Sequence, residues 1–224
     1  MSLFDSKIKS LLEENDFVDN PFFKNLRQEM TKEDFIKTQK QFFYAVIHFV
    51  SPLALVAAAI PSYEERVNII KNLWEEHGEG DMSQTHGQTF KELLRRLTGE
   101  TDLIIPSAEA GVNTFNSTLD NLSKNSSFLV SVGMIGIIER MFADISSYIG
   151  TAITERGWLE RERIIHYSVH QELDCIHAED FFSIIRPYYD DEEKRKLIDE
   201  GLELGVKTFL DLYSDLNKLA TSSK

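Results

Sequence analysis

Three side chains that can bind a metal ion, His170, Asp174 and His177, follow one another at intervals of four and three residues. In an α-helix with 3.6 residues per turn these positions lie on one face, so both imidazoles and the carboxylate can converge on one point. A solvated polar face would show the same spacing. Because the apolar residues Leu173 and Phe181 lie close by, the pattern is more typical of a helix between the core and a polar interior.

A further carboxylate lies within a strongly apolar stretch. Residues 127–149 place Glu139 on the same helical stripe as Ile135 and Phe142, and this stripe is predicted to be buried. A buried carboxylate is costly unless it is paired, protonated or bound to a cation. Two interpretations follow: a salt bridge to Arg140 or to a neighbouring helix, or a metal ligand.

A third group of candidate ligands occurs where glycines interrupt a helical pattern. Residues 72–81 read NLWEEHGEGD, and His86 follows. The two glycines break or bend the helix, so Glu76 can end one helical piece while His86 begins the next. Spacing alone does not choose among the chemically able residues of this stretch, which are Glu75, Glu76, His77, Glu79 and Asp81.

Together the three segments offer three carboxylates and three histidines, namely Glu76, His86, Glu139, His170, Asp174 and His177. Mixed imidazole and carboxylate ligation suits iron or manganese, and bridging carboxylates allow two ions to share one site in a helical bundle. A structural zinc site is less favoured. Such sites usually draw on several cysteines, and the chain has one, Cys175.

This ordered set resembles the ligands of the heme-oxygenase-like diiron oxidases. That family includes the chlamydial protein associating with death domains and the nitrogen-oxygenating domain of streptozotocin biosynthesis. The resemblance rests on Asn-Leu-x-x-Glu at residues 72–76, a following His86, Glu139 in an apolar helix, and the His-x3-Asp-x2-His pattern at residues 170–177. It implies an all-α fold: one heme-oxygenase-like helical domain over residues 1–224, with about seven to eight helices.

The resemblance also implies how the ligands divide between two iron ions, or one iron and one manganese. Three of them, Glu76, His86 and Glu139, would hold one ion, and His170, Asp174 and His177 would hold the other, with carboxylates bridging. The first carboxylate is the least secure assignment, because Glu79 is a nearby competitor.

Family members use the reduced metal pair to activate dioxygen. The resemblance therefore implies a nonheme iron-dependent oxidoreductase that needs dioxygen and an external reductant. Its reaction would be N-oxygenation, desaturation or carbon–carbon cleavage of a small amine, amino acid or carboxylate. The alternative is a non-catalytic helical interaction protein whose metal site is structural or vestigial.

Several positions depart from relatives with known chemistry. The chlamydial protein resembles a self-sacrificing 4-aminobenzoate synthase in which two tyrosines and a lysine are implicated, and the matching positions here hold Phe23, Ile138 and Ile149. No histidine precedes His48, whereas heme oxygenases need a proximal histidine near the N-terminus. The thiamin-degrading relatives use a catalytic cysteine, but Cys175 lies between two of the candidate ligands.

Helical periodicity runs through almost the whole chain, and no alternating pattern of strand length competes with it. Pro52 is predicted to kink the second helix. The predicted helices cover residues 6–15, 31–61, 61–76, 85–97, 107–121, 126–150, 160–187 and 191–219.

Composition limits the partners. The net charge of −13 disfavours binding to the phosphates of nucleic acids and, more mildly, to anionic membranes. The N-terminal residues lack the apolar core of a signal peptide, and one cysteine cannot form an intramolecular disulfide. We therefore expect a cytoplasmic protein that binds neither nucleic acid nor membrane and that could form a homodimer.

Overall fold

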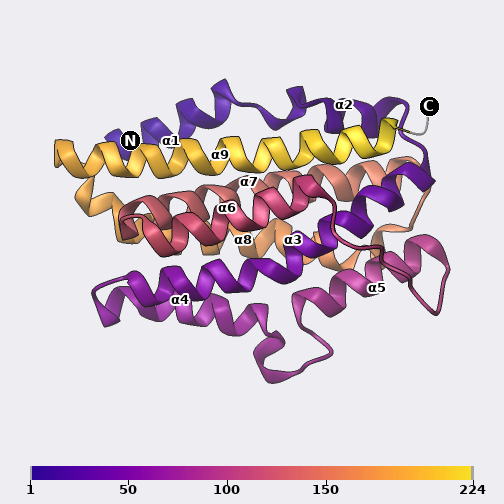
Figure 1. Ribbon diagram of the computed structural model, residues 1–224, viewed down its shortest axis with the longest axis horizontal. Helices are drawn as coiled ribbons and strands as arrows, with labels where there is room; N and C mark the ends of the chain where they lie inside the picture. The colour runs from indigo at the N-terminus through magenta and orange to yellow at the C-terminus, as the bar shows by residue number, and fades with distance from the viewer. Residues whose placement is uncertain (1, 223–224) are drawn as a thin grey trace.

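The computed structural model describes the backbone of residues 2–222 and the side chains of these residues except 169–172. Within this part of the chain all regular structure is helical, which confirms the predicted all-α class (Figure 1). The α-helices are α1 (Leu3–Glu14), α2 (Pro21–Gln28), α3 (Lys32–Ala59), α4 (Tyr63–Glu76), α5 (His86–Thr98), α6 (Ala110–Asn125), α7 (Phe128–Glu155), α8 (Ile165–Ile185) and α9 (Glu192–Thr221). Short 3-10 helices occupy Phe17–Asp19, Gly78–Gly80, Arg161–Arg163 and Arg186–Tyr188.

These nine described α-helices exceed the predicted seven to eight, and α2 accounts for the difference. Its eight residues are too few for the periodicity of apolar residues to identify a helix well. Local signals nevertheless fix it. The side chain of Asn20 accepts a hydrogen bond from the backbone N–H of Phe22 at 3.0 Å, and Pro21 fills the first helical position.

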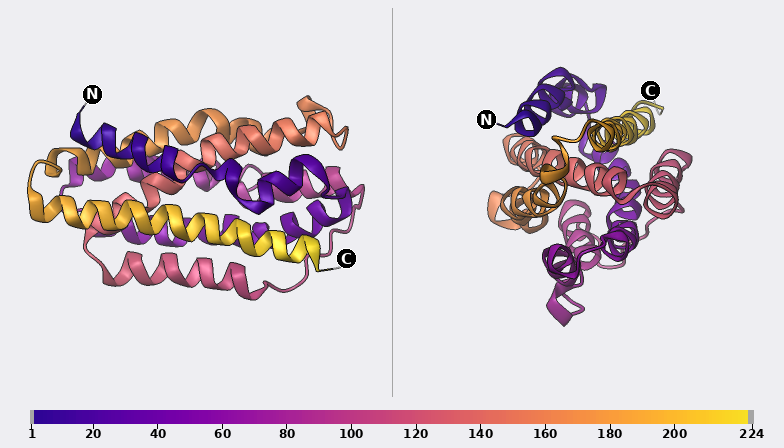
Figure 2. Two further views of the ribbon diagram at one scale, coloured as in Figure 1. Left: turned by 90° about the horizontal axis from the view of Figure 1, so that it is seen from above. Right: turned by 90° about the vertical axis from the view of Figure 1, so that its left-hand side faces the viewer.

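Helix α7, which has more buried residues than any other described helix, forms the centre of the bundle. It makes its most extensive contacts with α8 and α9 (Figures 1 and 2). Helix α3 contacts it near its middle, where the ring centroids of Phe42 and Phe142 lie 5.8 Å apart. Nearly every face of α7 is buried, as its almost continuous run of apolar residues predicts. Glu139 lies halfway along this helix, so the fold carries a carboxylate into its most apolar element.

One described helix, α3, is long and apolar enough to cross a membrane by length and composition alone. Buried core helices of soluble proteins pass the same test. In the bundle α3 packs against α5, α6 and α9, and its side chains Phe35, Leu53 and Val56 lie fully inside the core. Its apolar character is therefore used in packing within the molecule.

Close packing of α7 against α9 depends on two glycines of α9. A Cβ atom added at Gly201 would lie 2.2 Å from the carbonyl oxygen of Val130, and one added at Gly205 would lie 2.7 Å from that of Met134. Backbone atoms cannot move aside as a flexible side chain can. The absence of side chains at these two positions therefore sets the distance between the two helices.

We expect Gly201→Ala to lower the free energy of unfolding by about 1–3 kcal/mol, because the added methyl forces the helices apart. Chemical denaturation would measure the change. Gly150→Ala is the matched control: its nearest neighbour would be Cβ of Tyr167 at 3.8 Å, an ordinary contact. That control should be neutral or gain up to about 1 kcal/mol of helix propensity. Equal effects of the two substitutions would contradict this account.

Candidate metal centre

The ends of α4 and α5 bring the first two candidate ligands together. Glu76 is the last residue of α4 and His86 the first of α5. The connection turns back through left-handed backbone conformations, with φ of 65° at Gly78 and 53° at Glu79. A Cβ at Gly78 would also lie 2.7 Å from the backbone of Gln84. The glycine that interrupts the helical pattern thus allows the tight turn that returns His86 to Glu76.

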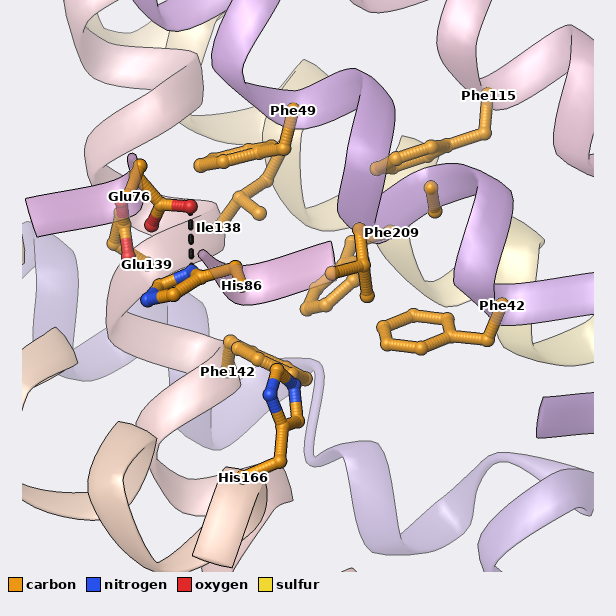
Figure 3. Close-up of a pocket in the computed structure, with 12 residues that line it drawn as sticks. Phe42, Phe49, Glu76, His86, Phe115, Ile138, Glu139, Phe142, His166 and Phe209 are labelled. Atoms are coloured by element: carbon orange, nitrogen blue, oxygen red, sulfur yellow. Dashed lines mark ion pairs between the residues drawn. The ribbon is translucent and has the colours of Figure 1, made fainter. Parts of the chain in front are cut away.

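In this arrangement Nδ1 of His86 lies 2.5 Å from Oε2 of Glu76, a contact drawn as the dashed line in Figure 3. Both side chains are largely buried. Burial works against a charged imidazole, but the Glu76 carboxylate outweighs it and raises the pKa of His86 above its usual value. The alternative first ligand, Glu79, is exposed on the turn. The structure therefore brings Glu76, and not Glu79, to His86.

Glu139 extends from the middle of α7 toward the same place and is buried. It accepts a hydrogen bond at 3.3 Å from the side-chain amide of Asn72 on α4. The salt bridge to Arg140 considered from the sequence is not formed, because Arg140 pairs with Asp144 one turn further on, at 2.8 Å. Burial, together with the charges of Asp174 and Glu76, raises the pKa of Glu139 well above its usual range.

Two candidates on α8 complete the described part of the cluster. Asp174 and His177 lie one turn apart and are almost fully buried. Nδ1 of His177 lies 3.8 Å from Asp174 and 4.0 Å from Glu139, and one ligand atom from each of the three residues lies within 4.8 Å of the others. Burial also raises the pKa of Asp174 well above its usual value. The remaining candidate, His170, has a side chain outside the described residues.

One contact at this site was not foreseen from the sequence. Oε2 of Glu75 accepts a hydrogen bond from Nε2 of His177 at 2.8 Å, and Lys71 lies 3.3 Å from the same carboxylate. The bond fixes the proton on Nε2 and leaves Nδ1 of His177 facing Asp174 and Glu139. The neighbouring residues Glu75 and Glu76 contact different histidines, His177 and His86. Which carboxylate reaches which histidine depends on the direction of α4 relative to α8.

The other histidines lie outside this cluster. His166 is buried, with Nδ1 at 3.1 Å from the hydroxyl of Thr89, and its ring centroid is 6.0 Å from that of His86. His48 is partly exposed and is hydrogen-bonded to Asp120 at 2.9 Å. His77 is the capping residue that follows the last residue of α4.

An apolar cavity opens onto the first group of ligands. It encloses about 480 Å³ of space, its open mouth included. Glu76, His86 and Glu139 form one end, and aromatic side chains extend away from them along the cavity (Figure 3). The other lining residues are Phe42, Ala45, Val46, Phe49, Phe115, Ile138, Phe142, His166 and Phe209. Among the described residues, neither a lysine nor an arginine lines this cavity.

The model of a family described as iron-containing redox enzymes matches residues 37–209, which include the cavity and every candidate ligand. The chain belongs to this family. Among curated proteins, it is 24% identical over 206 residues to a 4-aminobenzoate synthase from Nitrosomonas europaea, an alignment covering 86% of this chain and 82% of that protein. At this level of detail, the protein is an oxidoreductase of an iron-containing family.

Solved structures agree on the fold. A CADD-like protein of unknown function from Nostoc punctiforme superposes with a TM-score of 0.79 at 15% identity, covering 97% of this chain and 98% of that one. A domain with a heme oxygenase-like fold from Shewanella denitrificans superposes with a TM-score of 0.77 at 14% identity, covering 97% of this chain and 93% of that one. A TenA homologue from Pyrococcus furiosus superposes with a TM-score of 0.68 at 16% identity, covering 94% of this chain and 98% of that one. The predicted heme-oxygenase-like fold is confirmed.

The residues of this iron-containing redox enzyme fit a metal ion. Among the described residues, nothing lies within hydrogen-bond distance of the buried Nδ1 of His177. Its separations of 3.8 and 4.0 Å from two carboxylates are too long for hydrogen bonds. They are, however, within the roughly 4.4 Å that can separate two atoms bound to one ion at about 2.0–2.2 Å. A cation would also neutralise carboxylates that burial otherwise keeps protonated.

The buried carboxyl groups predict a pH dependence in the metal-free protein. A carboxyl whose pKa is higher in the folded state holds its proton more tightly there. The free energy of unfolding therefore falls as pH rises above about 4.5, the ordinary value for Glu139, toward the raised pKa. Each such proton contributes a slope of up to about 1.4 kcal/mol per pH unit. Urea denaturation with chelator present, repeated across this pH range, would measure the slope.

Glu139→Gln should make this slope shallower, because the amide has no proton to lose, and should stabilise the metal-free protein at neutral pH. Glu200→Gln, at an exposed position on α9, is the control and should leave the slope unchanged. If the wild type and Glu139→Gln gave the same slope, the folded state would not hold a proton at Glu139.

The contact between Glu75 and His177 predicts which ring nitrogen carries the proton. In ¹⁵N NMR spectra the neutral ring of His177 should be protonated at Nε2. Glu75→Gln should keep this tautomer, because the amide oxygen still accepts the bond, and Glu75→Ala should mix the two tautomers and lower metal affinity roughly 10- to 100-fold. Glu200→Ala, at an exposed position on α9, is the control. An unchanged tautomer in Glu75→Ala would refute this role.

Proposed function

We propose that the protein is a nonheme diiron oxidase or oxygenase that uses dioxygen and an external reductant to oxidise a small organic molecule. The observation that carries the proposal is the position of Glu139. It belongs at once to the cavity end formed with Glu76 and His86, and to the buried group formed with Asp174 and His177. A carboxylate shared by two sets of donors is what two neighbouring cations need.

In this proposal Glu76, His86 and Glu139 hold one ion, and His170, Asp174 and His177 hold the other. The ions are two irons, or iron with manganese. Reduced iron supplies the electrons and the open coordination positions with which dioxygen can be activated. The membership of the chain in a family of iron-containing redox enzymes and its mixed imidazole and carboxylate donors support this assignment.

The protein contributes shape and exclusion of water. Aromatic side chains such as Phe42, Phe142 and Phe209 line the cavity away from the carboxylates, so an apolar part of the substrate can displace water there. Since no lysine or arginine in the described part of the chain lines the cavity, recognition of an anionic group along these walls is disfavoured. We infer a small amine, amino acid or carboxylate whose polar group faces the metal ligands and whose apolar part lies among the phenylalanines.

Synthesis of 4-aminobenzoate, the activity named for the relative from Nitrosomonas europaea, is not the reaction we propose. The reactive tyrosines and lysine of the chlamydial protein correspond here to Phe23, Ile138 and Ile149, all of which are buried. These hydrocarbon side chains offer no phenol or amine to consume. The substrate would then have to enter from outside, and the cavity beside Glu139 supplies the space for it. Cys175 is exposed on α8 and does not line this cavity, so a thiamin-degrading chemistry has no nucleophile in it.

Anaerobic loading with Fe(II) followed by metal analysis tests the proposal. We expect about two irons per chain in the wild type, and a loss of one iron in Asp174→Ala or His170→Ala because one set of donors is broken. Dioxygen uptake by the reduced wild type should be measurable and should change when a substrate from a panel of amines, amino acids and carboxylates is added. Full iron content in either variant would contradict the ligand assignment.

Two controls separate the metal from the substrate. His48→Ala removes a histidine that pairs with Asp120 outside the cluster, and should keep both irons. Ala45→Phe fills the cavity from α3 and should keep the irons while abolishing the response to added substrate. Bound iron that never consumes dioxygen, with any compound of the panel, would instead favour an interaction protein with a structural metal site.

A further inference from the structure

The outer face of α4 carries a row of large apolar side chains that nothing in the described chain covers. Tyr63, Val67, Ile70 and Trp74 are 74%, 59%, 48% and 54% exposed. The opposite face of the same helix holds Asn72 and Glu76, which point into the metal centre. Figure 1 shows α4 at the outer edge of the bundle. An apolar stripe of this length on a surface helix is the mark of a binding surface.

The spacing of this stripe matches a helix–helix seam. The intervals from Tyr63 through Val67 and Ile70 to Trp74 are four, three and four residues, the alternation of core positions in packed helices. A second helix laid antiparallel would place Tyr63 against Trp74 and Val67 against Ile70. The stripe thus reads the same in both directions, with aromatic facing aromatic and aliphatic facing aliphatic.

Charges beside the stripe are complementary in the same register. Glu64 and Lys71 each follow a seam residue and lie on the same side of it, and both are exposed. In an antiparallel pair related by a twofold axis, Glu64 of one helix would approach Lys71 of the other, and the reverse contact would follow by symmetry. A surface that complements itself both in shape and in charge is suited to another copy of itself.

We propose that two copies of this chain associate through antiparallel packing of their α4 helices. Helix α4 has 14 residues, about 21 Å, so the seam is short and the dimer depends on protein concentration. The metal centres lie behind the interface, on the inner faces of the two helices. This inference does not rest on the proposed enzymatic activity, and its test requires no substrate.

Sedimentation velocity of the purified full chain, from low micromolar to several hundred micromolar, tests the proposal first. The wild type should shift from monomer to dimer over this range. Val67→Lys should raise the dimer dissociation constant by about tenfold or more, because it places two charges in the seam of each dimer. Ile104→Lys is the control: this residue is also apolar and is more exposed than Val67, but it lies between α5 and α6. A strictly monomeric wild type, or a dimer that Val67→Lys leaves intact, would overturn the proposal.

A charge exchange tests the antiparallel register. Glu64→Lys alone places lysines against lysines across the dimer, and Lys71→Glu alone places glutamates against glutamates, so each variant should dimerise more weakly than the wild type. A mixture of the two variants restores both attractive pairs and should form the mixed dimer preferentially. Circular dichroism would show that each variant is folded. Equal association of the separate and mixed variants would rule out the antiparallel pairing.

Discussion

The burial of Glu139 is the constraint on which the rest of the site depends. An ionised carboxylate in the middle of the most apolar helix carries a desolvation penalty of several kcal/mol, and no lysine or arginine among the described residues compensates it. Neighbouring carboxylates on Asp174 and Glu76 make the penalty larger. The arrangement becomes favourable when cations occupy the space between these groups. The metal-free fold is therefore less stable than it would be with apolar residues at these positions, and in return the donors are already in place for a metal ion.

Polar contacts make up much of the attachment of helix α4 to the bundle. Its buried side chains are Ile69, Asn72 and Glu76, of which only the first is apolar. Hydrogen bonds complete the attachment: Asn72 to Glu139 on α7, Glu75 to His177 on α8, and Asn68 to Asp180 at 2.9 Å, also on α8. Two of these three contacts involve candidate metal ligands. The position of α4 is therefore tied to the state of the metal centre more closely than that of any helix packed by apolar burial.

The parts of the site that a single helix defines could be predicted from the sequence. The intervals between Asp174 and His177, and the place of Glu139 on an apolar stripe, follow from 3.6 residues per turn. Contacts between helices could not. Whether Glu76 or Glu79 reaches His86 depends on a left-handed turn, and the bond from His177 to Glu75 joins residues 102 positions apart. Helix α2 was missed because capping, rather than periodicity, defines so short a segment.

The proposed metal binding and the proposed self-association both involve α4, and they are therefore coupled. Binding of metal ions to Glu76 would fix the inner face of the helix, while packing against a second copy would bury Tyr63, Val67, Ile70 and Trp74 on its outer face. Each event reduces the conformational entropy of the same short helix. Once one event has ordered α4, the other no longer has to offset that loss of entropy. The coupling is reciprocal: the free energy by which bound metal stabilises the dimer equals the free energy by which dimerisation strengthens metal binding. In this way a helix with little apolar attachment of its own becomes stable when both of its faces are occupied.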